Sequence, residues 1–530
     1  MTSHPVAVSG PVTVGLASVI AEHKARRPDA VALICGEREI TYSTLHRVAC
    51  RAANAILAAG LEPSARIGYL GLDSARYYQL LVAAAHTGVV LVPINRRLTM
   101  NEIAYVLDDS DCSLLFADSA HETVARQAVR GSAADTRLLL LDGDGTPGSD
   151  FAAWCAPFSE HCPESVVPQH DPILQLYTSG TTGQPKGVVI SQQTLFAVRD
   201  MRRAPDMPWL AVPQGERCLV AIPGFHMAGL TWVVQGLLDG ITTVVLPEFT
   251  PGSAVRTIRE RAVTALCAVP AMLALLIAEP DVTEGDFASL RQVAYAGSPI
   301  PDDVLTRCLA RFGCDFLQFY GMTETGTPIT FLSPQDHVPG SPRLRSAGRP
   351  HSLAEVMVVD RTGDPVPPRE VGEIVVLGPA PMLGYWKRPD ATAATLADGW
   401  VRTGDAGWLD EDGYLFISDR IKDVIIVAGE NVYPAEVENA IAAHPAVREV
   451  AVVGVPDDRW GEAVRAFVVL TSGQSVTPFE LTLHLRDRLA SFKRPGHIEF
   501  VDALPRNAAG KVLRRTLRDP FWSGRERAVN

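Results

Sequence analysis

Residues 177–187 read YTSGTTGQPKG and are the most informative stretch of this chain. They place three glycines, four serine or threonine hydroxyls and one lysine within eleven residues. Apolar runs at 173–176 and 188–190 flank the stretch, which predicts a strand, a loop and a second strand. A glycine-rich loop can turn its backbone N–H groups inward, and hydroxyls and an ammonium group add further donors. The stretch therefore predicts a cradle for a polyphosphate.

This loop differs from a Walker A motif. Lys186 is followed by Gly187 instead of serine or threonine, and a strand instead of a helix is expected after it. The alternative is an ordinary polar hairpin loop. A plain turn does not require so many hydroxyls beside a lysine, so the phosphate interpretation is favoured.

Composition describes an ordinary globular protein. The chain has 530 residues, of which 47% are hydrophobic and 20% charged, so we expect a large core and more than one domain. A net charge of −12 argues against a nucleic-acid binder, which normally carries a basic face. Nine cysteines form no Cys-x-x-Cys pair, so neither a zinc site nor a disulfide framework is indicated. Reduced thiols and a cytoplasmic location are expected.

The sequence predicts no secretory signal and no transmembrane segment. Residues 1–10 lack the basic start of a signal peptide. The most membrane-like stretch is 262–278, which carries no charge, but Pro270 divides it into an expected strand and an expected helix. Each half is too short to span a hydrocarbon layer of about 30 Å.

The first 420 residues alternate short apolar runs with amphipathic helical patterns. We expect a helix at 75–87 that ends at Gly88, a capping box between Thr99 and Glu102, strands at 89–94 and 114–117, and a polar loop at 131–149. Alternation of this kind predicts parallel α/β layers. The fold class is therefore α/β, with a large N-terminal domain, 1–420, built of layered α/β subdomains.

The pattern changes near residue 410. Residues 410–414 resemble a hairpin turn, and 420–423 form a short charged link. Shorter units follow, with strands expected at 424–427, 450–454 and 466–470 and helices at 434–443 and 479–489. These residues predict a small C-terminal α+β domain, 421–530.

Several further motifs follow the loop in a fixed order. They are PGFHMAG at 223–229, YAGSP at 295–299, FYGMTET at 319–325, GWVRTGD at 399–405, DRIKD at 419–423, GENV at 429–432 and PRNAAGK at 505–511. This ordered set closely resembles the adenylate-forming family, which contains acyl- and aryl-CoA synthetases, peptide-synthetase adenylation domains and insect luciferases. The resemblance extends over nearly the whole chain.

The resemblance implies a two-step reaction with ATP, Mg²⁺ and CoA. A carboxylate attacks the α-phosphate of ATP, which gives an acyl-adenylate and pyrophosphate, and a thiol then displaces AMP. Because the first step brings an anion onto a polyanion, the site must neutralise charge on the phosphoryl group and on the departing pyrophosphate.

The resemblance also assigns roles at the nucleotide site. Thr323 contacts the α-phosphate, Glu324 holds Mg²⁺ through oxygen ligands, and Asp405 and Arg420 bind the ribose. The pyrophosphate end is assigned to Thr178, Ser179, Gly180, Thr181, Thr182, Gly183 and Lys186, and the remaining nucleotide contacts to Gly297, Ser298, Tyr320, Gly321 and Met322.

A second group of roles depends on a mobile small domain. By resemblance, Lys511 is the catalytic lysine of the first step, and the domain then rotates about a hinge at Lys422 to build a thiol tunnel. Gly429 and Glu430 belong to this tunnel, and Phe225, His226 and Gly229 to the acyl pocket. Alternatives remain open, since Lys422 could be a salt-bridged surface lysine and His226 a satisfied core histidine.

Two departures from the family pattern leave the chemistry intact. Ala428 stands where many relatives have glycine, and Ala509 replaces a common threonine. The region around Phe225 has no aspartate to pair an α-amino group, which disfavours an amino-acid substrate.

The preferred interpretation is a CoA ligase for a fatty, alicyclic or aromatic carboxylic acid, since Phe225, Met227, Val233 and Val234 predict an apolar pocket. The alternatives are an enzyme that loads a separate acyl-carrier protein and a non-catalytic nucleotide-binding relative. A luciferase-like oxygenase is a more distant alternative. A homodimer is a further candidate assembly, and no nucleic-acid partner is expected.

Overall fold

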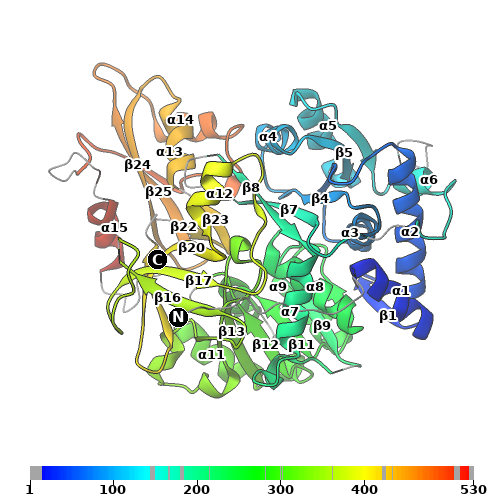
Figure 1. Cartoon of the computed structure of the whole chain (residues 1–530). Helices are drawn as coiled ribbons and strands as arrows, with labels where there is room; N and C mark the ends of the chain where they lie inside the picture. The colour runs from blue at the N-terminus through cyan, green and yellow to red at the C-terminus, as the bar shows by residue number, and fades with distance from the viewer. Residues whose placement is uncertain are drawn as a thin grey trace.

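The computed structural model describes residues 15–143, 150–164, 167–178, 184–213, 215–280, 282–298, 300, 302–360, 362–420, 425–432, 434–505, 512 and 514–523. Within them lie four β-sheets, three in the N-terminal part of the chain and one in the C-terminal part. Figure 1 shows the C-terminal sheet with α13 (Pro434–Ala442) and α14 (Pro478–Leu485) beside the larger N-terminal part. The α/β class with a large and a small domain is confirmed.

The first sheet contains the predicted strand, loop and strand. Its strands β7 and β8 are antiparallel, and their register pairs Thr178 with Lys186. Beyond β7 the strands run parallel, as expected for α/β layers. In spatial order the strands are β18 (Gly384–Tyr385), β8 (Lys186–Ser191), β7 (Pro172–Thr178), β4 (Val90–Pro93), β3 (Arg66–Leu70), β5 (Cys112–Ala117) and β6 (Arg137–Leu140).

The second sheet is longer and parallel through its centre, with antiparallel strands at both edges. The motifs at 295–299 and 319–325 follow the carboxyl ends of two adjacent central strands, β12 and β13. In spatial order the strands are β15 (Arg349–Pro350), β14 (Thr330–Leu332), β13 (Asp315–Tyr320), β12 (Gln292–Tyr295), β11 (Ala265–Ala268), β9 (Arg217–Val220), β10 (Thr242–Val245), β1 (Val31–Cys35) and β2 (Arg38–Thr41).

Two smaller sheets complete the fold. The antiparallel third sheet contains the hairpin predicted around 410–414, between β20 and β21. Its strands are β16 (Glu355–Val359), β17 (Gly372–Leu377), β20 (Trp400–Leu409), β19 (Leu396–Ala397) and β21 (Leu415–Arg420). The C-terminal sheet consists of β23 (Glu430–Val432), β22 (Ile425–Val427), β25 (Gly461–Leu470), β24 (Val447–Asp457) and β26 (His497–Phe500).

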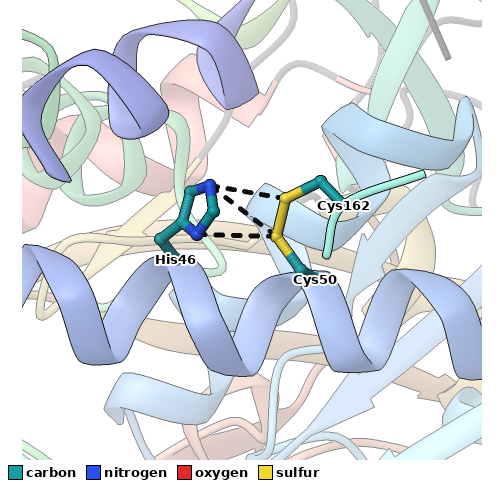
Figure 2. Close-up of side chains that lie close together, drawn as sticks. All are labelled: His46, Cys50 and Cys162. Carbon is teal, nitrogen blue, oxygen red and sulfur yellow. Dashed lines mark hydrogen bonds between the residues drawn. A yellow bond between two sulfur atoms is a disulfide. The ribbon is translucent and has the colours of Figure 1, made fainter. Parts of the chain in front are cut away.

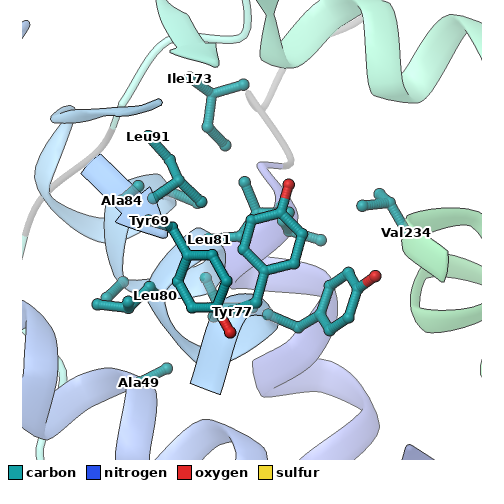
Figure 3. Close-up of a cluster of buried hydrophobic side chains, with 14 of the residues drawn as sticks. Ala49, Tyr69, Tyr77, Leu80, Leu81, Ala84, Leu91, Ile173 and Val234 are labelled. Carbon is teal, nitrogen blue, oxygen red and sulfur yellow. The ribbon is translucent and has the colours of Figure 1, made fainter. Parts of the chain in front are cut away.

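Helices pack on the large sheets through their apolar faces. Figure 3 shows part of one such cluster, which includes Tyr77 of α3, Leu91 of β4, Ile173 of β7 and Val234 of α8. Burial of a leucine-sized side chain contributes about 1.5–3 kcal/mol, so this cluster is a main source of stability. The helices of the N-terminal part are α1 (Leu16–Arg26), α2 (Tyr42–Ala58), α3 (Ala75–Thr87), α4 (Met100–Ser110), α5 (Glu122–Gly131), α6 (Phe151–Cys155), α7 (Gln192–Arg202), α8 (Met227–Asp239), α9 (Pro251–Glu260), α10 (Pro270–Ala278), α11 (Asp302–Phe312) and α12 (Pro389–Thr395).

Local signals in the sequence identify several helix ends correctly. The helix α3 ends before Gly88, whose φ of 75° is left-handed. At α4, the Thr99 side chain accepts from the Glu102 N–H, and the Thr99 N–H donates to the Glu102 carboxylate. The stretch at 262–278 divides at Pro270 as predicted, into β11 and α10. None of the helices in the described part of the chain has the length and apolarity that a membrane span needs.

Two expectations are wrong. The segment 131–149 is not entirely loop, because β6 pairs with β5 within it. The signal for β6 in the sequence is the run of four leucines at 138–141, which lies between polar segments. The structure also joins Cys50 and Cys162 in a disulfide, where reduced thiols are expected. The two cysteines lie 112 positions apart, and no sequence spacing indicates that they meet.

Candidate active site

A cavity of about 1030 Å³ collects residues from most of the sequence motifs. Its wall takes residues from all three N-terminal sheets and from the start of the C-terminal domain. Of the predicted site residues, it contains Thr178, Lys186, Phe225, His226, Gly297, Ser298, Tyr320, Gly321, Met322, Thr323, Glu324, Asp405, Gly429 and Glu430. Residues spread over more than 250 positions of sequence therefore meet at one place.

Glu324 lies in the polar part of the cavity, in a single turn at 323–325 that follows β13. The hydroxyl of Tyr385 donates to Glu324 Oε1 at 2.9 Å, and that of Thr178 to the same oxygen at 3.3 Å. Lys186 Nζ lies 4.9 Å from the centre of the Tyr385 ring. The strand ends of β7 and β8 thus bring a hydroxyl and an ammonium group to one buried carboxylate.

Burial is the largest influence on the Glu324 carboxyl and raises its pKa. Hydrogen bonds from Tyr385 and Thr178 and the charge of Lys186 act in the opposite direction, but burial prevails. A divalent cation would stabilise the ionised form of such a carboxyl. Its oxygen donors therefore suit a hard cation such as Mg²⁺.

Asp405 and Tyr320 lie together on another part of the wall. The Tyr320 hydroxyl donates to Asp405 Oδ2 at 2.8 Å, which leaves the carboxylate oriented at the cavity. Asp405 is nearly buried on β20 and stands opposite Arg420 of β21 in the strand register. Gly297 follows β12 with a φ of 89°, a left-handed conformation that favours glycine.

Apolar side chains cover the part of the wall near His226. They are Ile222, Phe225, Met227, Val269, Met272, Leu275 and Phe319. The turn that carries Phe225 and His226 is held from behind by two residues that sequence reasoning missed. The Gly224 N–H donates to both carboxylate oxygens of Asp73 at 3.0 Å, and the Tyr77 hydroxyl donates to the Gly224 carbonyl at 2.7 Å. Burial raises the pKa of Asp73 to about 6.

Glu430 connects the C-terminal domain to this wall. Its Oε2 lies 3.2 Å from His226 Nε2 and accepts a 3.3 Å hydrogen bond from the Asn95 amide, while Arg97 approaches Oε1 at 3.8 Å. Burial lowers the pKa of His226, but the charge and hydrogen bond of Glu430 outweigh it, so that the net pKa is raised. Burial likewise raises the pKa of Glu430, and the charge of His226 more than reverses this. Each partner therefore favours the charged form of the other.

Gly429 meets the N-terminal domain at Val269. Its φ is 80°, and a Cβ built on it would lie 3.1 Å from Val269 Cγ2. Ala428 is also left-handed, with a φ of 51°. An L-residue pays roughly 1–2 kcal/mol for this conformation, so the departure from glycine at Ala428 is a strained position.

Some predicted site residues cannot be placed. Ser179, Gly180, Thr181, Thr182, Gly183, Lys422 and Lys511 lie outside the described residues, and the side chain of Arg420 is not described.

Three residues expected near the acyl pocket lie elsewhere. Gly229 is a packing residue of α8, since a Cβ there would lie 2.3 Å from the Ile222 carbonyl oxygen. Val233 and Val234 belong to the core cluster, part of which Figure 3 shows, and do not line the cavity.

Comparison with known proteins gives consistent matches. A family model described as AMP-binding enzyme matches residues 20–386, and one described as AMP-binding enzyme C-terminal domain matches residues 436–511. Among curated relatives, the fatty acid–[acyl-carrier-protein] ligase ScoC of Streptomyces coeruleorubidus is 46% identical, over 96% of each chain. A feruloyl-CoA synthase of Amycolatopsis sp. is 39% identical, over 96% of this chain and 99% of its own.

Solved structures give a similar result. The o-succinylbenzoate CoA synthetase of Bacillus subtilis, as a double mutant bound to a product analogue, superposes with a TM-score of 0.84 at 32% identity, over 94% of this chain and 98% of its own. The same synthetase bound to ATP and magnesium gives 0.68 at 31% identity and equal coverage. The amide bond synthetase McbA of Marinactinospora thermotolerans gives 0.86 at 32% identity, over 96% and 99%.

Proposed function

The chain belongs to the AMP-binding enzyme family, and we propose that it activates a carboxylic acid with ATP and passes the acyl group to the thiol of CoA. It is an acid–thiol ligase of the AMP-forming type. The acid is proposed to be fatty, alicyclic or aromatic. The observation that carries the proposal is the single cavity in which Glu324, Asp405 and an apolar wall meet Gly429 of the other domain.

The first half-reaction uses the polar part of the cavity. Lys186 and Thr178 would bind the pyrophosphate end, Thr323 the α-phosphate and Asp405 the ribose, with the acid's apolar body against Phe225 and its neighbours. Glu324 would hold Mg²⁺, which supplies positive charge to the phosphate oxygens. Lys511 is proposed as the cation that brings the carboxylate and the α-phosphate together.

The second half-reaction uses the orientation that the structure adopts. The B. subtilis synthetase matches this chain better with its product analogue, at a TM-score of 0.84, than with ATP and magnesium, at 0.68. Because both comparisons involve the same enzyme at equal coverage, the difference supports an assignment of this structure to the thioester-forming orientation. Contacts of Gly429 with Val269 and of Glu430 with His226 agree with that assignment. The boundary is proposed at 420/421, with Lys422 as the hinge.

The test is an acid panel with ATP and Mg²⁺, in which AMP and pyrophosphate are measured with and without CoA. We expect AMP formation with at least one fatty, alicyclic or aromatic acid, and its acyl-CoA when CoA is added. The Glu324→Gln variant is the matched control, because it keeps the shape of the side chain and removes its charge. Absence of AMP with every acid, while the protein is folded, would refute the proposal.

A second candidate acceptor is an acyl-carrier protein. The observation in its favour is the 46% identity to the curated carrier-protein ligase over 96% of each chain. CoA and a carrier protein present the same phosphopantetheine arm, so the proposed thiol path would serve either acceptor. A holo-carrier protein and its apo form, which lacks the arm, are compared with CoA at equal thiol concentration. If the holo form is acylated faster than CoA, the carrier protein is the acceptor. Amide formation with added amines would refute a thiol acceptor.

A further inference from the structure

A cluster of two cysteines and two histidines lies outside the cavity. His46 and Cys50 are one helical turn apart on α2, and Cys162 belongs to the segment between α6 and β7 (Figure 2). His86, in the last turn of α3, completes the cluster. None of the four lines the proposed active site.

The donor atoms of this cluster are close together. Cys162 Sγ lies 3.4 Å from His46 Nε2, and Cys50 Sγ lies 3.7 Å from His46 Nδ1. Donor atoms of His46, Cys50 and Cys162 all lie within 4.8 Å of one another. His86 Nε2 approaches Cys50 Sγ at 4.0 Å from the opposite helix. Two soft sulfur donors and one imidazole thus converge from α2 and the Cys162 segment, and a second imidazole, on α3, contacts one of the sulfurs.

Polar contacts hold the Cys162 segment against α2 independently of the cysteines. The Asn54 amide donates to the carbonyls of Ser159 and His161 at 2.9 and 2.8 Å. Arg51 of the same helix pairs with Glu160 at 2.8 Å. Because these contacts do not involve sulfur, Cys162 would remain beside Cys50 when the disulfide is reduced.

The distances match those of a tetrahedral metal site. Zinc–sulfur bonds of about 2.3 Å and zinc–nitrogen bonds of about 2.0–2.1 Å imply a sulfur–nitrogen separation of about 3.6 Å at the tetrahedral angle. The distances from His46 Nε2 to the two sulfurs, 3.4 and 3.8 Å, and the 4.0 Å distance from His86 Nε2 to Cys50 Sγ bracket this value. The two sulfurs would have to separate to about 3.8 Å, and the Cys162 segment lies outside regular structure, so this shift does not distort a helix or strand.

We propose that Cys50, Cys162, His46 and His86 form a binding site for a zinc-class divalent ion, and that the disulfide is the oxidised, metal-free form of the same site. The donor set of two thiolates and two imidazoles is one that zinc takes in closed structural sites. Bound there, the ion would fasten α2, α3 and the 156–164 segment together. The proposal does not depend on which acid the enzyme activates.

The histidines are suited to this role. Burial lowers the pKa of His86 to about 4, and burial, assisted by Lys24, lowers that of His46. An imidazole binds a metal through the lone pair of its neutral form, which burial favours. Arg47 and Arg51 face the segment from α2, and Glu160 pairs with both, so the local charge is partly balanced.

The oxidised and reduced forms exclude one another. In the disulfide each sulfur is bonded to the other, whereas a metal needs two separate thiolates. A phosphine reductant breaks the sulfur–sulfur bond, takes an oxygen atom from water to become the phosphine oxide, and leaves two thiols. The metal then displaces the two thiol protons to solvent. Disulfides are rare in reducing compartments, where the thiol form and hence the metal site would prevail.

The test is a metal titration of the full chain. The protein is reduced with a phosphine, stripped of metal with a chelator that is then removed, and titrated with Zn²⁺ against a chromogenic chelator. Titration with Co²⁺ adds a spectroscopic readout, since thiolate ligation gives charge-transfer absorption and tetrahedral geometry gives intense visible bands. We expect one equivalent of metal with both signatures.

Variants identify the ligands. Cys162→Ala is the main variant, because its side chain is on a non-helical, half-exposed segment and its loss should leave the fold intact. We expect that Cys162→Ala and His46→Ala no longer bind the equivalent of metal, and that His86→Ala weakens metal binding at least about tenfold. Cys314→Ala is the matched control, since this half-buried free cysteine lies outside the cluster.

The outcomes are decisive in either direction. The site is supported if Cys314→Ala still binds one equivalent of metal and Cys162→Ala binds none. The circular dichroism of both variants must then be unchanged. Equal binding by the unaltered chain and Cys162→Ala would overturn the proposal. So would a disulfide that persists when excess reduced glutathione and Zn²⁺ are present together, because the pair would then be a structural cross-link only.

Discussion

Glu430 is the residue through which the small domain contacts His226, Asn95 and Arg97 of the large domain. The substitution Glu430→Gln keeps the shape of the side chain and its ability to accept a hydrogen bond, but removes its charge. Since the contact exists in the orientation assigned to thioester formation, its loss should slow that half-reaction. Adenylation, which the proposed function assigns to the other orientation, should remain unchanged or become faster.

The magnitude follows from the geometry. A buried hydrogen bond to a charged group contributes about 1.5–3 kcal/mol, and a neutral one about 0.5–1.5 kcal/mol, so neutralisation costs on the order of 1–1.5 kcal/mol. The Arg97 contact adds little, because at 3.8 Å and with a side chain 38% exposed it is well screened. The thioester step should therefore slow about five- to tenfold. Glu430→Ala leaves His226 buried without its partner, so this variant should slow the thioester step about a hundredfold or more.

The assay separates the two half-reactions. Adenylation is followed by pyrophosphate exchange, and thioester formation by a single turnover of preformed acyl-adenylate with CoA. The matched control is Glu411→Gln, which removes the same charge from an exposed ion pair with Arg369 away from the domain contact. Equal slowing of both half-reactions by Glu430→Gln, or no effect on either, would refute the reasoning.

The pH dependence provides an independent check. The pKa of His226 is raised in the contact, so the contribution of the ion pair is present below that pKa and is lost as the pH rises through it. Asp73 also acts to raise this pKa, and Arg97 to lower it. The thioester step should therefore decline as the pH rises through this raised pKa. In Glu430→Gln, the midpoint of the decline should move to lower pH, because burial then acts on His226 with less opposition.

Three further predictions concern the two half-reactions. Gly429→Leu should block thioester formation and spare adenylation, whereas Gly461→Leu, at an equal φ of 80° but with its nearest neighbour 4.0 Å away, should affect neither half-reaction selectively. Tyr385→Phe removes a hydrogen-bond donor to Glu324, so the pKa of Glu324 should rise. In a plot of adenylation rate against pH, the midpoint of the acid limb should therefore move to higher pH. Lys511→Ala should slow adenylation about a hundredfold or more and leave transfer from preformed acyl-adenylate intact, as the two half-reaction assays will measure.

Much of the fold follows from local patterns in the sequence. The ends of α3 and α4 depend on Gly88, Thr99 and Glu102, and each lies where its side chain or backbone conformation requires. The hairpin between β20 and β21 is likewise a local feature. The short strand β6 has a local signal as well, the four leucines at 138–141, but the polar residues on both sides favour a loop, and pairing with β5 decides between the two.

Some residues of the candidate site could likewise be predicted from the sequence, and others could not. Motif order alone located the wall residues Glu324 and Asp405, whose neighbours in sequence carry the signal. Asp73 and Tyr77 escaped because they act from about 150 positions away, by holding the backbone of Gly224. Val233 was misassigned because an apolar helix residue next to a pocket motif can face either the pocket or the core. Only the packing of α8 decides between these faces.

Lys493 suggests how the domain contact can be both buried and reversible. Its ammonium group donates to Glu102 of the large domain at 2.9 Å and to Glu436 of its own domain at 2.7 Å. Burial lowers the pKa of Lys493, but the two carboxylates raise it overall, so the lysine is charged in this orientation. If the small domain rotates, Lys493 keeps Glu436, and Glu102 keeps the capping contacts of its other oxygen with Thr99. Neither charge is then stranded, so separation costs far less than the roughly 3–5 kcal/mol of breaking a buried pair.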